Sequence, residues 1–205
     1  MRGYMDFTIA SGWKWFNGNE AVPLLKKHNL LSHGNILLSE SSLTNFLEAI
    51  NLSPVTIEIK RNEICKIEKK DADYLEVDAS QDAIIRDVWL VQAGKKLVYA
   101  HSVFPIAGLN KNLLEKISAS IEPLGRRLTD QGMLTLKDKL EVSAVWCAEV
   151  NKELGLPPEN THWAKHYRLL AKPADEGKGI VASVTEIFSH ELMGKPPQNG
   201  FRVTN

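Results

Sequence analysis

The sequence has no net charge, no long hydrophobic run and few cysteines, and each of these absences excludes a class of protein. Its 25 lysines and arginines balance 25 aspartates and glutamates, so no overall field draws the chain to nucleic acid or to an anionic membrane. No apolar run approaches the roughly 18 residues that a membrane-spanning helix needs. Residues Met1 to Thr8 lack the basic and apolar parts of a secretion signal. We therefore expect a cytoplasmic protein with no nucleic-acid or membrane partner.

The two cysteines, Cys65 and Cys147, are too few for a disulfide framework and have no Cys-x-x-Cys spacing. His162 and His166 are four residues apart, but they fall in a strand-like run, where that spacing separates them by about 13 Å. No metal site is expected. The chain also lacks internal repeats and linkers rich in proline, glycine or serine. Its 205 residues, 43% of them hydrophobic, predict a single domain over residues 1–205.

Apolar residues at helical spacing predict two helices. The first covers Ser39–Leu52, with a serine as N-cap and Pro54 as terminator. The second covers Asn110–Glu122, capped by Asn110 and ended by Pro123. The stripes that define them are Leu43, Phe46, Leu47 and Ile50 in the first helix, and Leu113, Leu114, Ile117 and Ile121 in the second. A third helix or a strand is expected over Leu140–Leu154.

Alternating and β-rich runs predict strands joined by short turns. Such strands pair as hairpins, so we expect one antiparallel sheet in an α+β domain, and not a doubly wound parallel sheet. The expected pairs are Val55–Lys60 with Ile64–Lys69 around a turn at Arg61–Glu63, Ile84–Val91 with Leu97–Phe104 around Gln92–Lys96, and His162–Lys172 with Ile180–Ser189 around Pro173–Gly179.

Two charged residues interrupt apolar faces of these strands. Successive residues of a strand point to opposite faces, so Arg86 and Glu186 each lie in a row of apolar side chains. The rows are Ile84, Val88 and Leu90 for Arg86, and Ile180, Ala182, Val184 and Phe188 for Glu186. Burying either charge alone costs several kcal/mol, so each needs a partner, a pKa shift or a ligand.

Three interpretations of these two residues are open. Arg86 and Glu186 pair with each other as a structural ion pair, or the face assignment is wrong by one residue. Alternatively, they close a mostly apolar pocket in which Arg86 holds an anion by a bidentate contact and Glu186 handles a hydroxyl or a proton.

Short segments in matching order and spacing carry a resemblance to a known family. They are Ser42–Glu48 (SLTNFLE), Ile85–Leu90 (IRDVWL), Ala100–Pro105 (AHSVFP), Pro123–Arg126 (PLGR) and the strands containing Trp163–Leu169 and Thr185–Phe188. Together they resemble the chorismate lyase family, which forms 4-hydroxybenzoate and pyruvate from chorismate. The similarity covers a core of about residues 39–189. The segment 135–158 is longer than usual in that family, and residues 193–205 extend past its normal end.

The resemblance implies a role for particular residues. It implies that Arg86 holds the ring carboxylate of chorismate and that Glu186 binds the para hydroxyl, and these are the expected catalytic residues. Leu43 and Leu124 match positions whose backbone N–H groups lie near the ring carboxylate. The resemblance also implies a chorismate lyase-like sheet, no cofactor and no metal, a monomer or weak oligomer, and a product that feeds aromatic or quinone precursor biosynthesis such as that of ubiquinone.

His101 departs from the family pattern, because the family usually has an arginine at this position. That arginine is expected to help bind the second, enolpyruvyl carboxylate, so we expect His101 in the substrate site, with Arg126, Arg127 or Arg168 able to compensate for the lost charge. The alternative function is a non-catalytic module that binds a small aromatic carboxylate, because a related fold forms the effector domain of some bacterial transcription regulators. No winged-helix segment precedes the domain here, and this disfavours a stand-alone regulator.

Overall fold

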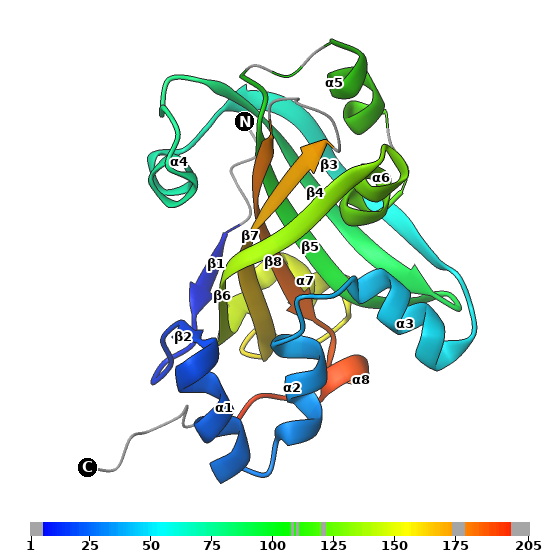
Figure 1. Ribbon diagram of the computed structural model, residues 1–205. Coiled ribbons are helices and arrows are strands. Elements are labelled where there is room, and N and C mark those ends of the chain that lie inside the picture. Colours follow the sequence, from blue (N-terminus) through cyan, green and yellow to red (C-terminus); the bar gives the residue numbers. More distant parts are fainter. Residues whose placement is uncertain (1–5, 108, 110, 120–121, 174–178, 198–205) are drawn as a thin grey trace.

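One antiparallel sheet forms the centre of the molecule in a computed structural model that describes residues 6–107, 109, 111–119, 122–173 and 179–197 (Figure 1). Its order is β1-β6-β7-β8-β5-β4-β3, and β2 pairs with β6. The expected α+β class with a single antiparallel sheet is confirmed. The strands are β1 Phe7–Ile9, β2 Phe16–Asn17, β3 Val55–Lys66, β4 Asp82–Gln92, β5 Lys95–Pro105, β6 Met133–Cys147, β7 Thr161–Pro173 and β8 Ile180–Phe188.

Two of the predicted strand pairs are present. β4 and β5 form a hairpin around Ala93 and Gly94, whose positive φ angles of 49° and 75° suit a two-residue turn. β7 and β8 also pair antiparallel. Of the loop predicted between them, residues 174–178 lie outside the described residues.

The predicted hairpin over residues 55–69 is wrong. β3 is one continuous strand that pairs with β4 from Val55 to Lys66, with a register shift between Ile59 and Arg61. The residues Arg61, Asn62 and Glu63 each pair with a residue of β4, so the chain does not reverse there. The irregularity that resembled a turn is therefore a bulge, which bends a strand without reversing it.

The helix predicted over residues 39–52 is α3, with Ser42 as N-cap: its Oγ accepts a bond from the Asn45 amide at 3.3 Å. The second predicted helix is α5, but Asn110 and Ile121 lie outside the described residues. The ambiguous segment 140–154 is a strand followed by a helix. The helices are α1 Gly18–Lys27, α2 Leu31–Leu37, α3 Leu43–Asn51, α4 Lys69–Leu75, α5 Lys111–Ser118, α6 Leu124–Asp130, α7 Ala148–Glu153 and α8 His190–Met193. No helix among the described residues has the length and apolar character to cross a membrane.

Helices cover both faces of the curled sheet (Figure 1). On one face, here called the inner face, α1, α2 and α3 pack on a cluster that includes Val88, Leu90 and Phe188. At the other end of the same face, α5 and α6 pack on a cluster that includes Tyr167 and Val184. The outer face is covered by α4 and α7. The inner face therefore has two apolar clusters, and the space between them is where a ligand can enter.

The Gln92 side chain connects the end of β4 to α3 through hydrogen bonds. Its buried Nε2 donates to the carbonyl oxygens of Leu47 at 3.0 Å and Ser53 at 2.7 Å, and its Oε1 accepts from Asn51 at 2.6 Å. Buried polar groups cost most when one partner is removed and the others stay unsatisfied. This side chain therefore fixes the helix whose first turn reaches the space between the clusters.

Replacing this glutamine tests the attachment of α3. We expect Gln92→Met to lower the free energy of unfolding by about 2–4 kcal/mol, because two buried carbonyls and one amide lose their partner. Urea denaturation measures the change, and Gln81→Met, at a partly exposed glutamine before β4, is the control with little expected effect. Equal stability of Gln92→Met and the wild type would show that the attachment is unimportant.

Candidate functional site

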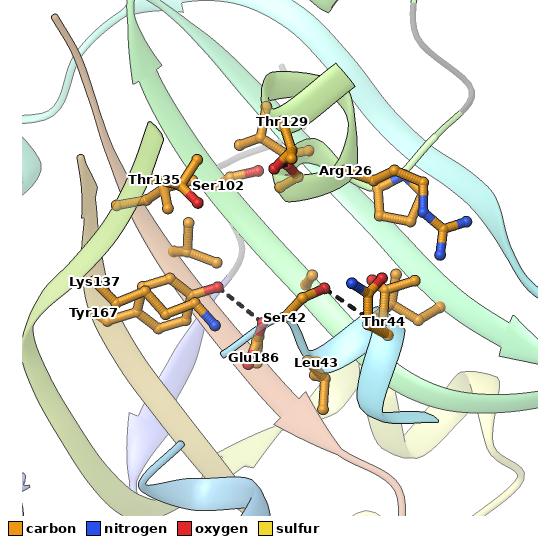
Figure 2. Close-up of a pocket in the computed structure, with 18 of the residues that line it drawn as sticks. Ser42, Leu43, Thr44, Ser102, Arg126, Thr129, Thr135, Lys137, Tyr167 and Glu186 are labelled. Carbon is orange, nitrogen blue, oxygen red and sulfur yellow. Dashed lines mark hydrogen bonds between the residues drawn. The ribbon is translucent and has the colours of Figure 1, made fainter. Parts of the chain in front are cut away.

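A cavity of about 290 Å³ lies on the inner face between the two apolar clusters. This volume is close to the smaller pockets that bind small molecules in proteins. Its floor is formed by alternate residues of β4, β5, β8, β7 and β6, and the first turns of α3 and α6 form its sides. Figure 2 shows side chains from all of these directions converging on one space.

Arg86 and Glu186 both line this cavity, as the pocket interpretation predicted. Both side chains are buried, with 3% and 6% of their surface exposed. The registers place them on the same face, because Arg86 pairs with Ser102 and Glu186 pairs with Ala100 on the intervening strand β5. Their Cα atoms are thus separated by two strand spacings and by two residues along β5, about 12 Å in all. The face assignment made from alternation is confirmed.

The Arg86 guanidinium lies beside the segment that leads into α6. Its Nη2 donates to the Glu122 carbonyl oxygen at 2.9 Å. Burial lowers the pKa of Arg86 from its ordinary value, but an arginine stays protonated at physiological pH. A buried cation in a cavity wall gains free energy from an anion that replaces its lost hydration.

The Glu186 carboxylate contacts two side chains of the neighbouring strand β7. Lys165 Nζ lies 3.2 Å from its Oε2, and the Tyr167 hydroxyl donates to its Oε1 at 2.9 Å. The ion pair of Glu186 is therefore with Lys165, and the interpretation in which it pairs with Arg86 is wrong. Burial alone would raise the pKa of Glu186, but the charges of Lys165 and Lys137 and the Tyr167 bond outweigh it and lower the pKa. Glu186 is thus held as a carboxylate, which accepts a hydrogen bond from a hydroxyl group.

The structure also brings Leu43 and Leu124 to the cavity wall. Each is the first residue of its helix, α3 and α6. The first N–H groups of a helix have no partner inside it, so both positions can present backbone donors. That these backbone N–H groups act on a ligand stays a prediction.

His101 is the predicted site residue that the structure separates from the others. Its neighbours Ala100 and Ser102 line the cavity, so alternation turns His101 to the outer face. There its Nδ1 lies 2.6 Å from Asp87 Oδ1, and 5% of the residue is exposed. The full thickness of the sheet lies between this imidazole and the cavity.

Of the three arginines considered as substitutes for the lost charge, Arg126 alone is among the described residues of the cavity wall. Its Nη2 lies 2.6 Å from Glu48 Oε2, so α6 is paired with α3 across the cavity mouth. Arg168 points away from the cavity, and its Nη2 lies 2.7 Å from Asp138 Oδ2. The Nη1 of Arg127 lies 3.6 Å from Glu122 Oε2. No group of three or more described His, Cys, Asp or Glu side chains is arranged to hold a metal.

The family model of the Rv2949c-like chorismate pyruvate-lyases matches residues 37–194, which is more than half of the chain. The chain belongs to this family. The matched range begins just before α3 and ends just after α8, so it includes every element that lines the cavity. No curated protein sequence matches the chain.

Solved structures with a similar fold include a possible transcriptional regulator and an effector domain. A possible transcriptional regulator from Bacillus subtilis, YydK, is 18% identical with a TM-score of 0.50, over 78% of this chain and 66% of that one, just under two thirds. The effector domain of PhnF from Mycobacterium smegmatis is 14% identical with a TM-score of 0.56, over 73% and 89% of the two chains. Complete PhnF is 10% identical with a TM-score of 0.57, over 91% and 90%. At these identities the similarity shows the fold alone.

In this chorismate pyruvate-lyase family member, three further residues near the cavity escaped the sequence analysis: Lys137, Lys165 and Tyr167. Lys165 is only 1% exposed and lies directly across from Glu186 in the β7–β8 pair. A signal for it exists, because Lys165 interrupts the apolar row of Trp163 and Leu169 in β7, just as Arg86 interrupts its own row. Lys137 has no such signal, because its neighbours in β6 are mostly exposed.

The Lys165–Glu186 pair gives a prediction for stability. We expect Lys165→Met to lower the free energy of unfolding by about 3–5 kcal/mol, because it leaves a buried carboxylate without its cation. The pKa of Glu186 then rises, so the deficit is full at neutral pH and shrinks as the pH falls and the carboxylate takes up a proton. Urea denaturation from pH 7 to pH 4.5 measures both effects.

Two comparisons separate this effect from simple loss of a lysine. Lys14→Met breaks the exposed pair with Glu20 and is expected to cost less than about 1 kcal/mol. The double variant Lys165→Met/Glu186→Leu removes both charges and is expected to regain much of the lost stability. A Lys165→Met deficit that stays the same at all pH values would contradict the role given to Glu186.

Proposed function

We propose that the protein is a chorismate lyase that converts chorismate into 4-hydroxybenzoate and pyruvate. The observation that carries this proposal is that a buried cation, Arg86, and a buried carboxylate, Glu186, lie apart on one cavity floor. Val88 and Ala100 lie between them. A ring with a carboxylate at one end and a hydroxyl at the other fits this order of groups. Membership of the chorismate pyruvate-lyase family supports the same assignment.

The ring carboxylate of chorismate is assigned to the Arg86 end of the cavity. A guanidinium presents its N–H donors in a fixed plane, and the Nη2 of Arg86 donates to the Glu122 carbonyl oxygen. The first turn of α6, which starts at Leu124, adds backbone donors beside it. An anion at this end therefore meets both a charge and dipoles in a largely dry wall, where charge-assisted hydrogen bonds are strong.

The ring hydroxyl is assigned to Glu186. Because Lys165 keeps this carboxylate charged, it accepts a hydrogen bond from the hydroxyl of the substrate or the product. The Tyr167 hydroxyl already fixes one of its oxygens. The second contact fixes the direction of the ring axis that runs from the carboxylate to the hydroxyl, which a single anchoring point cannot do.

The reaction needs few groups because the substrate supplies its own driving force. The ether bond at ring carbon 3 breaks, the hydrogen on the hydroxyl-bearing carbon 4 leaves, and the enolpyruvate fragment gains a proton at its methylene carbon to become pyruvate. The ring becomes aromatic, and no outside oxidant or reductant is consumed. Orientation in a closed site, with charges fixed before the reaction, is then the contribution asked of the protein.

A ligand-binding module without chemistry is the second candidate, and the same cavity favours it: Arg86 and Glu186 would hold an aromatic carboxylate whether or not it reacts. The two functions differ in turnover, since a lyase releases pyruvate and a binding module does not.

Incubation with chorismate tests the proposal directly. We expect equimolar 4-hydroxybenzoate and pyruvate, measured together by chromatography. Arg86→Met and Glu186→Gln are each expected to lower kcat/KM by about 100-fold or more, because each removes a charged contact in a buried site. Arg168→Met and Glu141→Gln are the matched controls, because they remove the same groups from the opposite face of the sheet.

The outcomes separate the two candidates. Product formation that survives in Arg86→Met or Glu186→Gln would refute the assigned roles of these residues. Absence of turnover by the wild type, together with saturable binding of 4-hydroxybenzoate that Arg86→Met abolishes, would identify a binding module in place of a lyase. Circular dichroism of each variant confirms that it is folded.

A further inference from the structure

Chorismate carries a second carboxylate on its enolpyruvyl group, and this inference, which rests on the proposed function, concerns where that carboxylate binds. His101, the residue expected there, lies on the outer face of the sheet beside Asp87. The ether oxygen is attached to the ring carbon next to the one that bears the hydroxyl. The second carboxylate must therefore lie on the Glu186 side of the cavity and away from Arg86.

Lys137 is a cation of the cavity wall on that side. It pairs with Leu169 in the β6–β7 register, so its side chain emerges from the inner face. Its Nζ donates to the Ser41 carbonyl oxygen at 2.8 Å and lies 4.7 Å from the centre of the Tyr167 ring. Figure 2 shows Lys137 beside Tyr167, near Glu186 and across the cavity from Arg126.

We propose that Lys137 binds the enolpyruvyl carboxylate and is the residue by which the cavity distinguishes a dicarboxylate from a monocarboxylate. An ammonium group has three donors, and the bond to Ser41 uses one of them. The ammonium lies where β6 approaches the segment before α3, so it can reach a group that projects sideways from the ring. Arg86 and Lys137 then hold the two carboxylates, while Glu186 holds the hydroxyl between them.

The electrostatics around Lys137 support this role. Burial lowers its pKa to about 8, with Glu186 of β8 and Glu40 raising the pKa and Lys165 of β7 lowering it. The charge is thus present at neutral pH but only weakly compensated, so a bound carboxylate stabilises it. Affinity for a dicarboxylate should fall as the pH rises above about 8, while affinity for a monocarboxylate should not follow this titration.

Two stable ligands that differ only in the second carboxylate test the inference. They are 3-(carboxymethoxy)-4-hydroxybenzoate and 3-methoxy-4-hydroxybenzoate, and calorimetry measures the binding of both. We expect Lys137→Met to weaken the dicarboxylate about ten- to a hundredfold and to change the monocarboxylate less than about twofold. Lys137→Arg should retain most of the preference, because it keeps the positive charge.

Lys139→Met is the matched control. It removes the same charge two residues away, where the ammonium pairs with Glu76 at 2.6 Å outside the cavity wall. This control should bind both ligands as the wild type does, which separates a local contact from the effect of overall charge.

Each outcome has a distinct meaning. A selective loss of the dicarboxylate in Lys137→Met, with recovery in Lys137→Arg, supports the inference. Equal loss of both ligands, or no loss of either, overturns it and leaves the proposed function untouched, because turnover of chorismate tests that function separately. Failure of the wild type to bind either ligand overturns the inference alone if the wild type turns over chorismate, and overturns the inference and the proposed function together if it does not.

Discussion

The buried ion pair between Lys165 and Glu186 constrains the whole inner face of the sheet. Two charges withdrawn from water must be close together and hydrogen-bonded, or the fold loses several kcal/mol. The antiparallel register of β7 and β8 places these residues directly opposite each other. Tyr167 donates a hydrogen bond to Glu186, and the Ile36 and Ser39 carbonyls accept hydrogen bonds from Lys165. The segment before α3 is thereby tied to the sheet, so the cavity wall and the cavity floor are positioned by one network.

Polar residues cross the sheet in adjacent rows on opposite faces. Arg86, Lys165 and Glu186 point inward, while their chain neighbours Asp87, His166 and Thr185 point outward. On the outer face these neighbours are covered by α4 and bonded among themselves, for example His101 to Asp87 and His166 to Thr185 at 2.9 Å. On the inner face the row lies between two apolar clusters and lines a cavity. Polar residues of the same strands thus bond to one another on the outer face and form a candidate binding site on the inner face.

Much of this arrangement was predictable from the sequence, because strand alternation is a local property. It placed Arg86 and Glu186 on one face correctly, and the same test applied to β7 would have found Lys165. The role given to His101 conflicted with that alternation, since its neighbour Ala100 lies in the cavity. Lys137 was beyond such reasoning, because its burial depends on how closely the segment before α3 approaches β6. The bulge in β3 was mistaken for a turn, because both interrupt alternation in the same way.

Contacts to groups that the substrate and the product share accelerate a reaction through orientation and through any strengthening in the transition state. In the proposed lyase, Arg86 and Glu186 contact groups that chorismate and 4-hydroxybenzoate share, so they orient the ring and bind substrate and product alike. A contact to the enolpyruvyl carboxylate is different, because its target leaves with pyruvate. Such a contact can stabilise the charge that develops on the departing fragment. Once pyruvate has left, the contact no longer contributes to the binding of 4-hydroxybenzoate. The contact proposed for Lys137 is therefore the one that separates the proposed lyase from a domain that only binds an aromatic carboxylate.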